Sequence, residues 1–252
     1  MRKKVLLAVT ALALLMAAGP ADALRIRAGN LLIIGDGGFT PRALPKNQDA
    51  PIVIYGGGRI TTVSGDLPPI LRDLNFEFDR HGHVETDGLP FCTAAKLQAT
   101  TVPVARKACP GSIVGKGAGK AIIAFPDQAP FPVSSPITLF NGPKKHGNDT
   151  VLAHAYTDVP TPTTFIVPVE IQKIDKGVYG YRTEARIPTI AGGYGIPVSG
   201  HLQIGRRWTY KGIQHSYINA RCATGRLQAR GEFTFNDGTR LSGTFVRACT
   251  VR

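Results

Sequence analysis

The sequence predicts an all-β fold, either an antiparallel β-sandwich or a strongly curved, barrel-like sheet. In several segments apolar and polar residues alternate with a period of two, which is typical of strands with one solvated face. Turn signals separate these segments, and 29 Gly and 19 Pro interrupt the chain too often for a coiled coil. With 43% hydrophobic and 19% charged residues, the chain can bury a core and does not have the composition of a disordered protein.

The alternating segments are residues 74–79, 165–171, 196–204 and 227–235. Between strands, residues 79–82 have the Asp and Gly positions of a type I turn, and residues 236–238 (Asn-Asp-Gly) are a strong hairpin signal. Short connections of this kind predict that neighbours in the sequence are neighbours in the sheet. Four prolines in residues 126–136 predict an extended linker between strands.

The first 23 residues have the pattern of a secretory signal peptide. A basic start is followed by a largely apolar run of 14 residues and then by the small residues Ala21 and Ala23. This apolar run is too short to span a bilayer comfortably. We therefore expect a secreted protein, extracellular or associated with the cell envelope, whose residues 24–252 form a single β-rich domain. Strand-like runs at 30–34 and 52–55 predict that the N-terminal part joins the same sheet.

Four cysteines in an exported chain predict two disulfides. Of the three possible pairings we favour Cys92–Cys109 and Cys222–Cys249, because each pair brackets a short local unit. The first pair encloses the main helical signals, a capping threonine and a helix-starting proline within residues 93–109, so we expect a short disulfide-stapled helical insertion. The spacings contain no C-x-x-C motif, which argues against a zinc or redox site.

Five short motifs stand out between residues 60 and 252. They are Phe78-Asp79-Arg80-x-Gly82, Gly88-Leu89-Pro90-x-Cys92, Ile190-Ala191-Gly192-Gly193, Gly205-Arg206-Arg207 and Ser216-Tyr217-x-x-Ala220-x-Cys222. In these motifs the chain resembles a family of secreted actinobacterial proteins of unknown function. The resemblance implies export, one domain and paired cysteines, and it carries over no catalytic residue.

A candidate metal site is formed by Asp79, His81, His83 and Glu85, which are spaced by two residues. On a continuous strand these side chains would share one face and could bind Zn²⁺ or Mn²⁺. The turn signal at residues 79–82 would interrupt such a strand and separate them. We therefore expect no metal here and no other cofactor.

A glycine-rich segment at residues 115–120 has the composition of a phosphate-binding loop but not its spacing. The motif requires Gly where Val114 stands, and Ser or Thr where Ala121 stands. The better interpretation is a strand with Gly115, Gly117 and Gly119 on one face, where small residues allow a neighbouring segment to approach closely.

The C-terminal part of the chain is basic: residues 201–252 hold nine Lys and Arg and two acidic residues. Removing residues 1–23 takes away three basic residues and one acidic residue, so the mature chain keeps a net charge of +11. Arginines interleaved with aromatic residues on strands suit anionic polymers, sugars or single-stranded nucleic acid. The candidate binding residues are Arg206, Arg207, Trp208, Tyr210, Lys211, Tyr217 and Arg221. The alternative is a solvated strand face with Trp208 in the core.

No motif identifies a reaction, since both G-x-S-x-G and H-E-x-x-H are missing, and catalytic residues stay unknown. We expect a non-catalytic binding protein whose basic surface contacts an anionic cell-envelope polymer or polysaccharide. Two alternatives stay open: a carrier of a lipid or another apolar ligand, and a secreted hydrolase whose site is formed only by tertiary contacts. The sequence leaves the oligomeric state open.

Overall fold

The computed structural model describes residues 23–252, so the predicted signal peptide lies outside the described residues except for Ala23. The twelve strands of the main sheet are β1 (Leu24–Ala28), β2 (Leu31–Thr40), β5 (Val53–Thr62), β6 (Leu71–Asp79), β8 (Ile113–Ile123), β9 (Phe131–Asn141), β10 (Asp149–Thr157), β11 (Thr163–Lys176), β12 (Tyr179–Arg186), β13 (Gly195–Ile204), β17 (Arg226–Phe235) and β18 (Arg240–Ala248). The short strands are β3 (Ala43–Leu44), β4 (Ala50–Pro51), β7 (Gly82–Val84), β14 (Arg207–Tyr210), β15 (Ile213–Ser216), β16 (Ile218–Ala220) and β19 (Thr250–Val251). The helices are α1 (Ala94–Leu97) and α2 (Val102–Ala108), with 3₁₀ turns η1 (Pro110–Ser112) and η2 (Ala191–Gly193).

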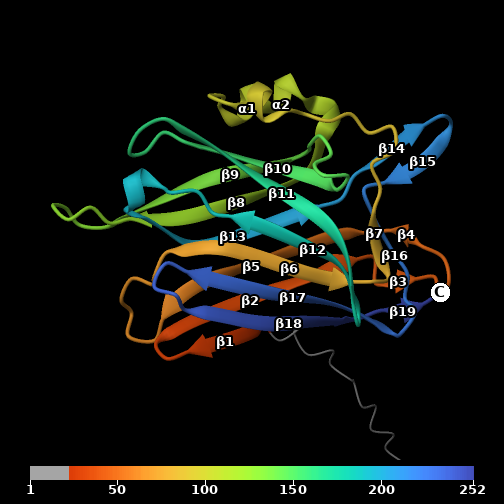
Figure 1. The fold of residues 1–252 in the computed structure, drawn as a ribbon, viewed down its shortest axis with the longest axis horizontal. Coiled ribbons are helices and arrows are strands. Elements are labelled where there is room, and N and C mark those ends of the chain that lie inside the picture. Colours follow the sequence, from red (N-terminus) through yellow and green to blue (C-terminus); the bar gives the residue numbers. More distant parts are fainter. Residues whose placement is uncertain (1–22) are drawn as a thin grey trace, which may run out of the picture.

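The main sheet is antiparallel and has the order β1-β2-β5-β13-β8-β9-β10-β11-β12-β6-β17-β18. Its two edges meet, because β18 packs against β1 and β2, and the sheet is therefore nearly closed into a barrel (Figure 1). At this junction a Cβ atom on Gly35 would lie 3.1 Å from the ring of Phe245, so β18 approaches β2 closely. The predicted all-β class is confirmed, with the strongly curved, barrel-like form.

The apolar residues of the alternating segments point to the inside of the sheet. One core cluster includes Phe39, Val151 and Leu227 and lies toward one end of the strands. A second cluster, with Leu31 and Phe235, lies toward the other end, since Leu31 and Phe39 are at opposite ends of β2. The polar residues between them point outward, so the outer face of the sheet holds most of the charged side chains.

The glycine-rich segment forms β8, as predicted, and its glycines face inward. A Cβ atom on Gly117 would lie only 2.1 Å from the carbonyl oxygen of His201, and one on Gly115 would lie 2.4 Å from that of Gln203. Glycine is therefore required for β13 to lie this close to β8, and the segment has a packing role.

The prediction of an extended linker at residues 126–136 is wrong for its second half. Strand β9 begins at Phe131 and contains Pro132 and Pro136. Residues 131–136 of β9 pair with β8, whereas β10 pairs only with residues 137–141 of β9. This part of β9 thus has a free edge, and prolines are tolerated there because no partner strand requires their missing N–H groups.

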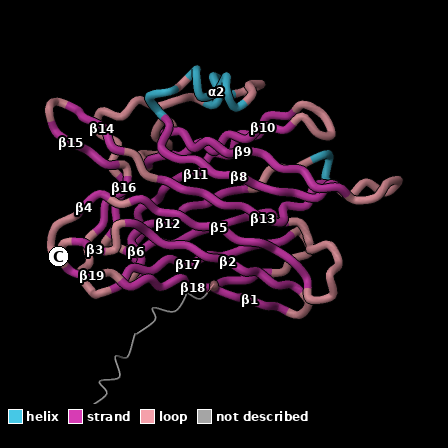
Figure 2. Tube along the Cα trace, turned by 180° about the vertical axis from the view of Figure 1, so that it is seen from behind, coloured by secondary structure: helices cyan, strands magenta, loops and turns pink. Residues whose placement is uncertain are grey.

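The helical insertion is confirmed and packs on the outer face of β9 and β10 (Figures 1 and 2). The Cys92–Cys109 disulfide closes it, Thr93 caps α1 through the main-chain N–H of Lys96, and Pro103 lies in the first turn of α2. Its buried side chains pack with Phe140 and Leu152 in a third cluster. The second predicted disulfide, Cys222–Cys249, is also present.

We expect the attachment of this insertion to weaken at acid pH because of His154. This side chain is fully buried between β10 and the insertion, and its Nε2 lies 3.1 Å from the carbonyl oxygen of Thr100. Burial lowers the pKa of His154 below its usual value. Arg106 of α2 donates to Thr138, the residue opposite His154 on β9, so a protonated His154 would also lie near a fixed positive charge.

The histidine has a lower pKa in the folded state than its value of about 6.5 in the unfolded chain, so the unfolded chain binds the proton more readily. The contribution of His154 to stability is therefore fully present above pH 6.5 and is lost as the pH falls below that value. The measurement is urea unfolding between pH 7.5 and 5 of the wild type and of His154→Gln. The stability of the variant should depend less on pH over this window. Parallel pH profiles for the two proteins would contradict the role of His154.

Candidate functional site

Three of the seven candidate binding residues are built into the end of the barrel. Arg206 donates to the carbonyl oxygen of Ile113 at 2.9 Å, and Arg221 pairs with Asp49 at 3.0 Å. Tyr217 is completely buried, and this desolvation raises its pKa. These three side chains hold the end of the barrel together, although the side chain of Arg221 is still 36% exposed.

The other four candidates lie on the β14–β15 hairpin, which projects beside the barrel (Figure 1). Trp208 is half-buried: its indole N–H donates to the carbonyl oxygen of Asp87 at 3.0 Å, and its ring stacks on His215 at 5.5 Å. Arg207, Tyr210 and Lys211 stay exposed, and the Lys211 ammonium lies 5.2 Å from the centre of the Tyr210 ring. The structure thus leaves a small basic and aromatic hairpin rather than a seven-residue surface.

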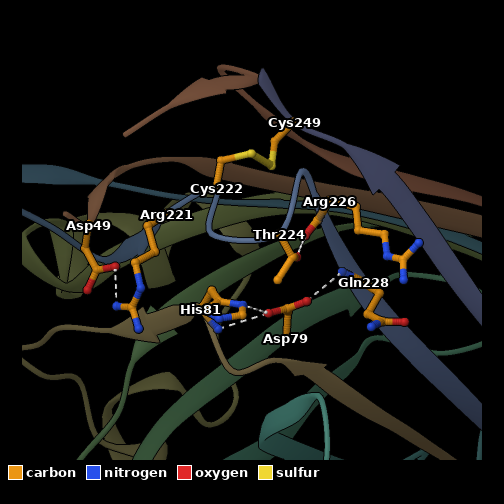
Figure 3. A network of polar contacts seen from close by, with 9 residues as sticks. All are labelled: Asp49, Asp79, His81, Arg221, Cys222, Thr224, Arg226, Gln228 and Cys249. Carbon is orange, nitrogen blue, oxygen red and sulfur yellow. Dashed lines mark hydrogen bonds and ion pairs between the residues drawn. A yellow bond between two sulfur atoms is a disulfide. The ribbon is translucent and has the colours of Figure 1, made fainter. Parts of the chain in front are cut away.

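The first two candidate metal ligands form a turn at the end of β6 (Figure 3). One carboxylate oxygen of Asp79 accepts hydrogen bonds from the main-chain N–H of His81, at 3.0 Å, and lies 2.8 Å from its ring nitrogen Nδ1. The other oxygen accepts from the main-chain N–H of Gln228 in β17, at 3.2 Å. Asp79 therefore links the turn to the neighbouring strand, as the turn signal in the sequence indicates.

The remaining candidate ligands have different partners. His83 Nδ1 lies 3.1 Å from Asp49, whereas Glu85 is hydrogen-bonded to His215 of β15 and to Asn219. Within residues 23–252, no group of three or more His, Cys, Asp or Glu side chains has an arrangement that could hold a metal ion.

Strand pairing creates a second basic surface, on the outer face of β1, β2, β5, β13 and β8. Residues in register run in one row across these strands: Arg25 is opposite Ile34, Ile34 opposite Arg59, Arg59 opposite Ser199, and Ser199 opposite Lys120. With about 4.8 Å between strands, the three cations Arg25, Arg59 and Lys120 follow each other at roughly 10 Å. Two further cations, Arg27 and Lys116, belong to the same outer face. We call these five residues the basic face.

The basic face is electrostatically uncompensated. All five side chains are exposed, and none of them forms an ion pair with any residue between 23 and 252. The five strands contain one acidic residue, Asp36, and it pairs with Arg247 of β18. Ser199 lies between Arg59 and Lys120, and Ile34 lies between Arg25 and Arg59, so no acidic side chain separates the three cations of the row.

The sequence alone does not reveal this surface, because the five residues of the basic face are spread over residues 25–120. Each cation occupies an ordinary outward position on a strand, and no local cluster marks it. The spacing within each pair is a weak sequence signal for the basic face. Arg25 and Arg27 are two residues apart, and Lys116 and Lys120 are four apart, so each pair lies on one side of its strand. The order of strands that joins the two pairs is set by tertiary structure.

In residues 23–252 the longest helices are far too short to cross a membrane, and none is a candidate membrane span. A scan against protein-family models found no match to the chain, and a search of curated proteins found none either.

Proposed function

We propose that the chain is an exported, non-catalytic binding protein, extracellular or associated with the cell envelope, whose basic face holds an anionic polymer. The observation that carries this proposal is the row of Arg25, Arg59 and Lys120, three exposed cations without acidic partners among residues 23–252. Unpaired charges on one face create a positive field that attracts an extended anion. The row crosses five strands, so an extended polymer could contact all three cations at once.

Two observations favour binding over the alternatives. A hollow of about 740 Å³ on the outer face has charged walls, which suit neither a lipid nor another apolar ligand. His81, His83 and His215 each contact a different carboxylate, and they do not converge with a nucleophile in one cleft. The partner class is an anionic envelope polymer, such as one rich in phosphate, or an acidic polysaccharide.

The test removes two cations of the basic face with Arg59→Gln and Lys120→Gln in one protein. We expect weaker retention on heparin, lipoteichoic acid and DNA matrices, with elution at lower salt. On duplex DNA, each lost phosphate contact should reduce the salt slope of log K by about 0.9, so the double variant should be shallower by about 2.

Two matched variants also lose two charges each. Arg207→Gln with Lys211→Gln tests the hairpin, and Lys46→Gln with Lys173→Gln tests exposed, unpaired residues elsewhere. The proposal requires a larger effect from the basic face than from either matched variant. Equal shifts in elution for all three variants would mean that net charge alone determines retention. If the hairpin variant shifts most, the binding site lies on β14 and β15 and not on the basic face.

A further inference from the structure

A groove runs over the other half of the barrel, on the outer face of β11, β12, β6, β17 and β18. Its volume is about 740 Å³, and β10 and the loop before it form one end. From β10 to β18 the groove crosses six strands, which corresponds to about 24 Å at the usual strand spacing. It is long enough for several units of a chain-like ligand.

The middle of the groove is a row of hydrogen-bond acceptors in register. Glu170 lies opposite Glu184, Glu184 opposite Asn75, and Asn75 opposite Glu232. One end of this row is Thr150, which lies opposite Glu170 on β10. Carboxylates directly opposite each other on adjacent strands are unfavourable unless something compensates them.

Arginines flank this acidic row on both sides and compensate it. Arg182 bonds Glu184 at 2.8 Å, and Arg230 bonds Glu232 at 3.0 Å. On the opposite side of the row lie Arg186, which is 3.6 Å from Asp73, and Arg240. The groove therefore carries many charges that are largely paired with one another, in contrast to the basic face.

This pairing selects the ligand. A charged ligand would have to break existing ion pairs before making new ones, whereas a hydroxyl group can add to them. One hydroxyl donates to a carboxylate of the middle row and accepts from a guanidinium beside it, since it carries one donor and two lone pairs. A chain of hydroxyl groups without net charge matches this array of fixed donors and acceptors.

Two groups in the groove have unused hydrogen-bonding capacity. Thr150 lines the groove and is only 3% exposed, and its hydroxyl oxygen has no hydrogen-bond partner among residues 23–252. Buried hydroxyls are nearly always paired, so this one has capacity left for a water molecule or for a ligand hydroxyl. Arg240, near the other end, is exposed and pairs with no acidic residue of the described part of the chain.

We propose that this groove binds a neutral oligosaccharide, with its hydroxyl groups between the acidic row and the arginines. The inference is independent of the basic face, because it rests on paired charges and hydrogen bonds rather than on net charge. Binding should therefore persist at 0.5 M NaCl, where attraction between exposed charges is screened within about 4 Å.

The experiment is isothermal titration of the mature protein with cellohexaose, chitohexaose, maltohexaose and xylohexaose in 0.5 M NaCl. We expect at least one of these to bind. Thr150→Val keeps the side-chain shape and removes the hydroxyl, and it should weaken binding about three- to tenfold, the value of one hydrogen bond. Arg240→Gln should have an effect of similar size, and Arg226→Gln, an exposed arginine of β17 outside the groove, is the matched control.

The outcomes are distinct from those for the basic face. The variant Arg59→Gln with Lys120→Gln should bind the hexasaccharide normally, and Arg240→Gln should elute from heparin like Arg226→Gln. Thr150→Val should melt no lower than the wild type because it removes an unpaired buried hydroxyl. If it does melt lower, the affinity of Arg240→Gln for the hexasaccharide tests the proposal instead. The proposal is overturned if no hexasaccharide binds at 10 mM, or if both groove variants bind like the wild type.

Discussion

Replacing both Cys222 and Cys249 with alanine is expected to lower the free energy of unfolding by about 3.5 kcal/mol. The bridge spans 27 residues, and in the chain-entropy model its loss frees that loop in the unfolded state. The loop contains the β17–β18 hairpin, whose strand β18 closes the barrel against β1 and β2. Figure 3 shows the bridge beside the Asp79 turn. Urea unfolding of the oxidised wild type and of the double variant measures the difference.

The Cys92–Cys109 bridge provides the comparison. It spans 17 residues, so the same model gives a slightly smaller loss of about 3 kcal/mol when both cysteines become alanine. That loop encloses only the helical insertion on the outside of the sheet. If neither double variant unfolds at lower urea than the wild type, the bridges do not stabilise the protein. If the insertion variant loses clearly more, loop entropy is not the main contribution.

Local features of the fold could be predicted from the sequence because few residues determine them. Thr93, Pro103 and two cysteines lie within one short stretch, and together they specify two helices and the bridge that holds them. Alternation along the chain determines which residues of β6 or β17 face the core. In each case the physical cause acts over a few neighbouring residues.

Strand order could not be predicted in the same way. β13 lies between β5 and β8, and β6 lies between β12 and β17, so segments far apart in the sequence become neighbours. The basic face and the groove both depend on these pairings, because register is what aligns Arg25 with Lys120 and Glu170 with Glu232. The predicted C-terminal site rested on net charge and on arginines interleaved with aromatic residues along strands. Neither reveals that Arg206 bonds a carbonyl oxygen of the barrel or that Tyr217 is buried.

The second large effect is expected at Glu77. This side chain is 2% exposed, in the centre of the outer face of β6. Its carboxylate lies 2.9 Å from the ammonium of Lys176 and 3.8 and 3.9 Å from the guanidinium groups of Arg182 and Arg230. Glu77 thus compensates three cations on three neighbouring strands, which would otherwise repel each other.

Replacing Glu77 with alanine should lower the free energy of unfolding by about 3 kcal/mol. This is the lower end of the range for breaking a buried ion pair, because its three cationic partners are partly exposed. The matched control is Glu184→Ala on the adjacent strand. Glu184 also bonds Arg182, at 2.8 Å, but its side chain is half exposed, so its removal should cost at most about 1 kcal/mol.

Urea unfolding of the two variants separates burial from ion pairing, since both lose one glutamate that contacts Arg182. A second comparison uses Lys176→Ala alone and together with Glu77→Ala. Because Lys176 makes the closest contact with Glu77, its removal should cost less in the Glu77→Ala background than in the wild type. Equal losses for Glu77→Ala and Glu184→Ala would show that the buried position adds nothing. Simple additivity with Lys176→Ala would show that the carboxylate and the ammonium do not interact.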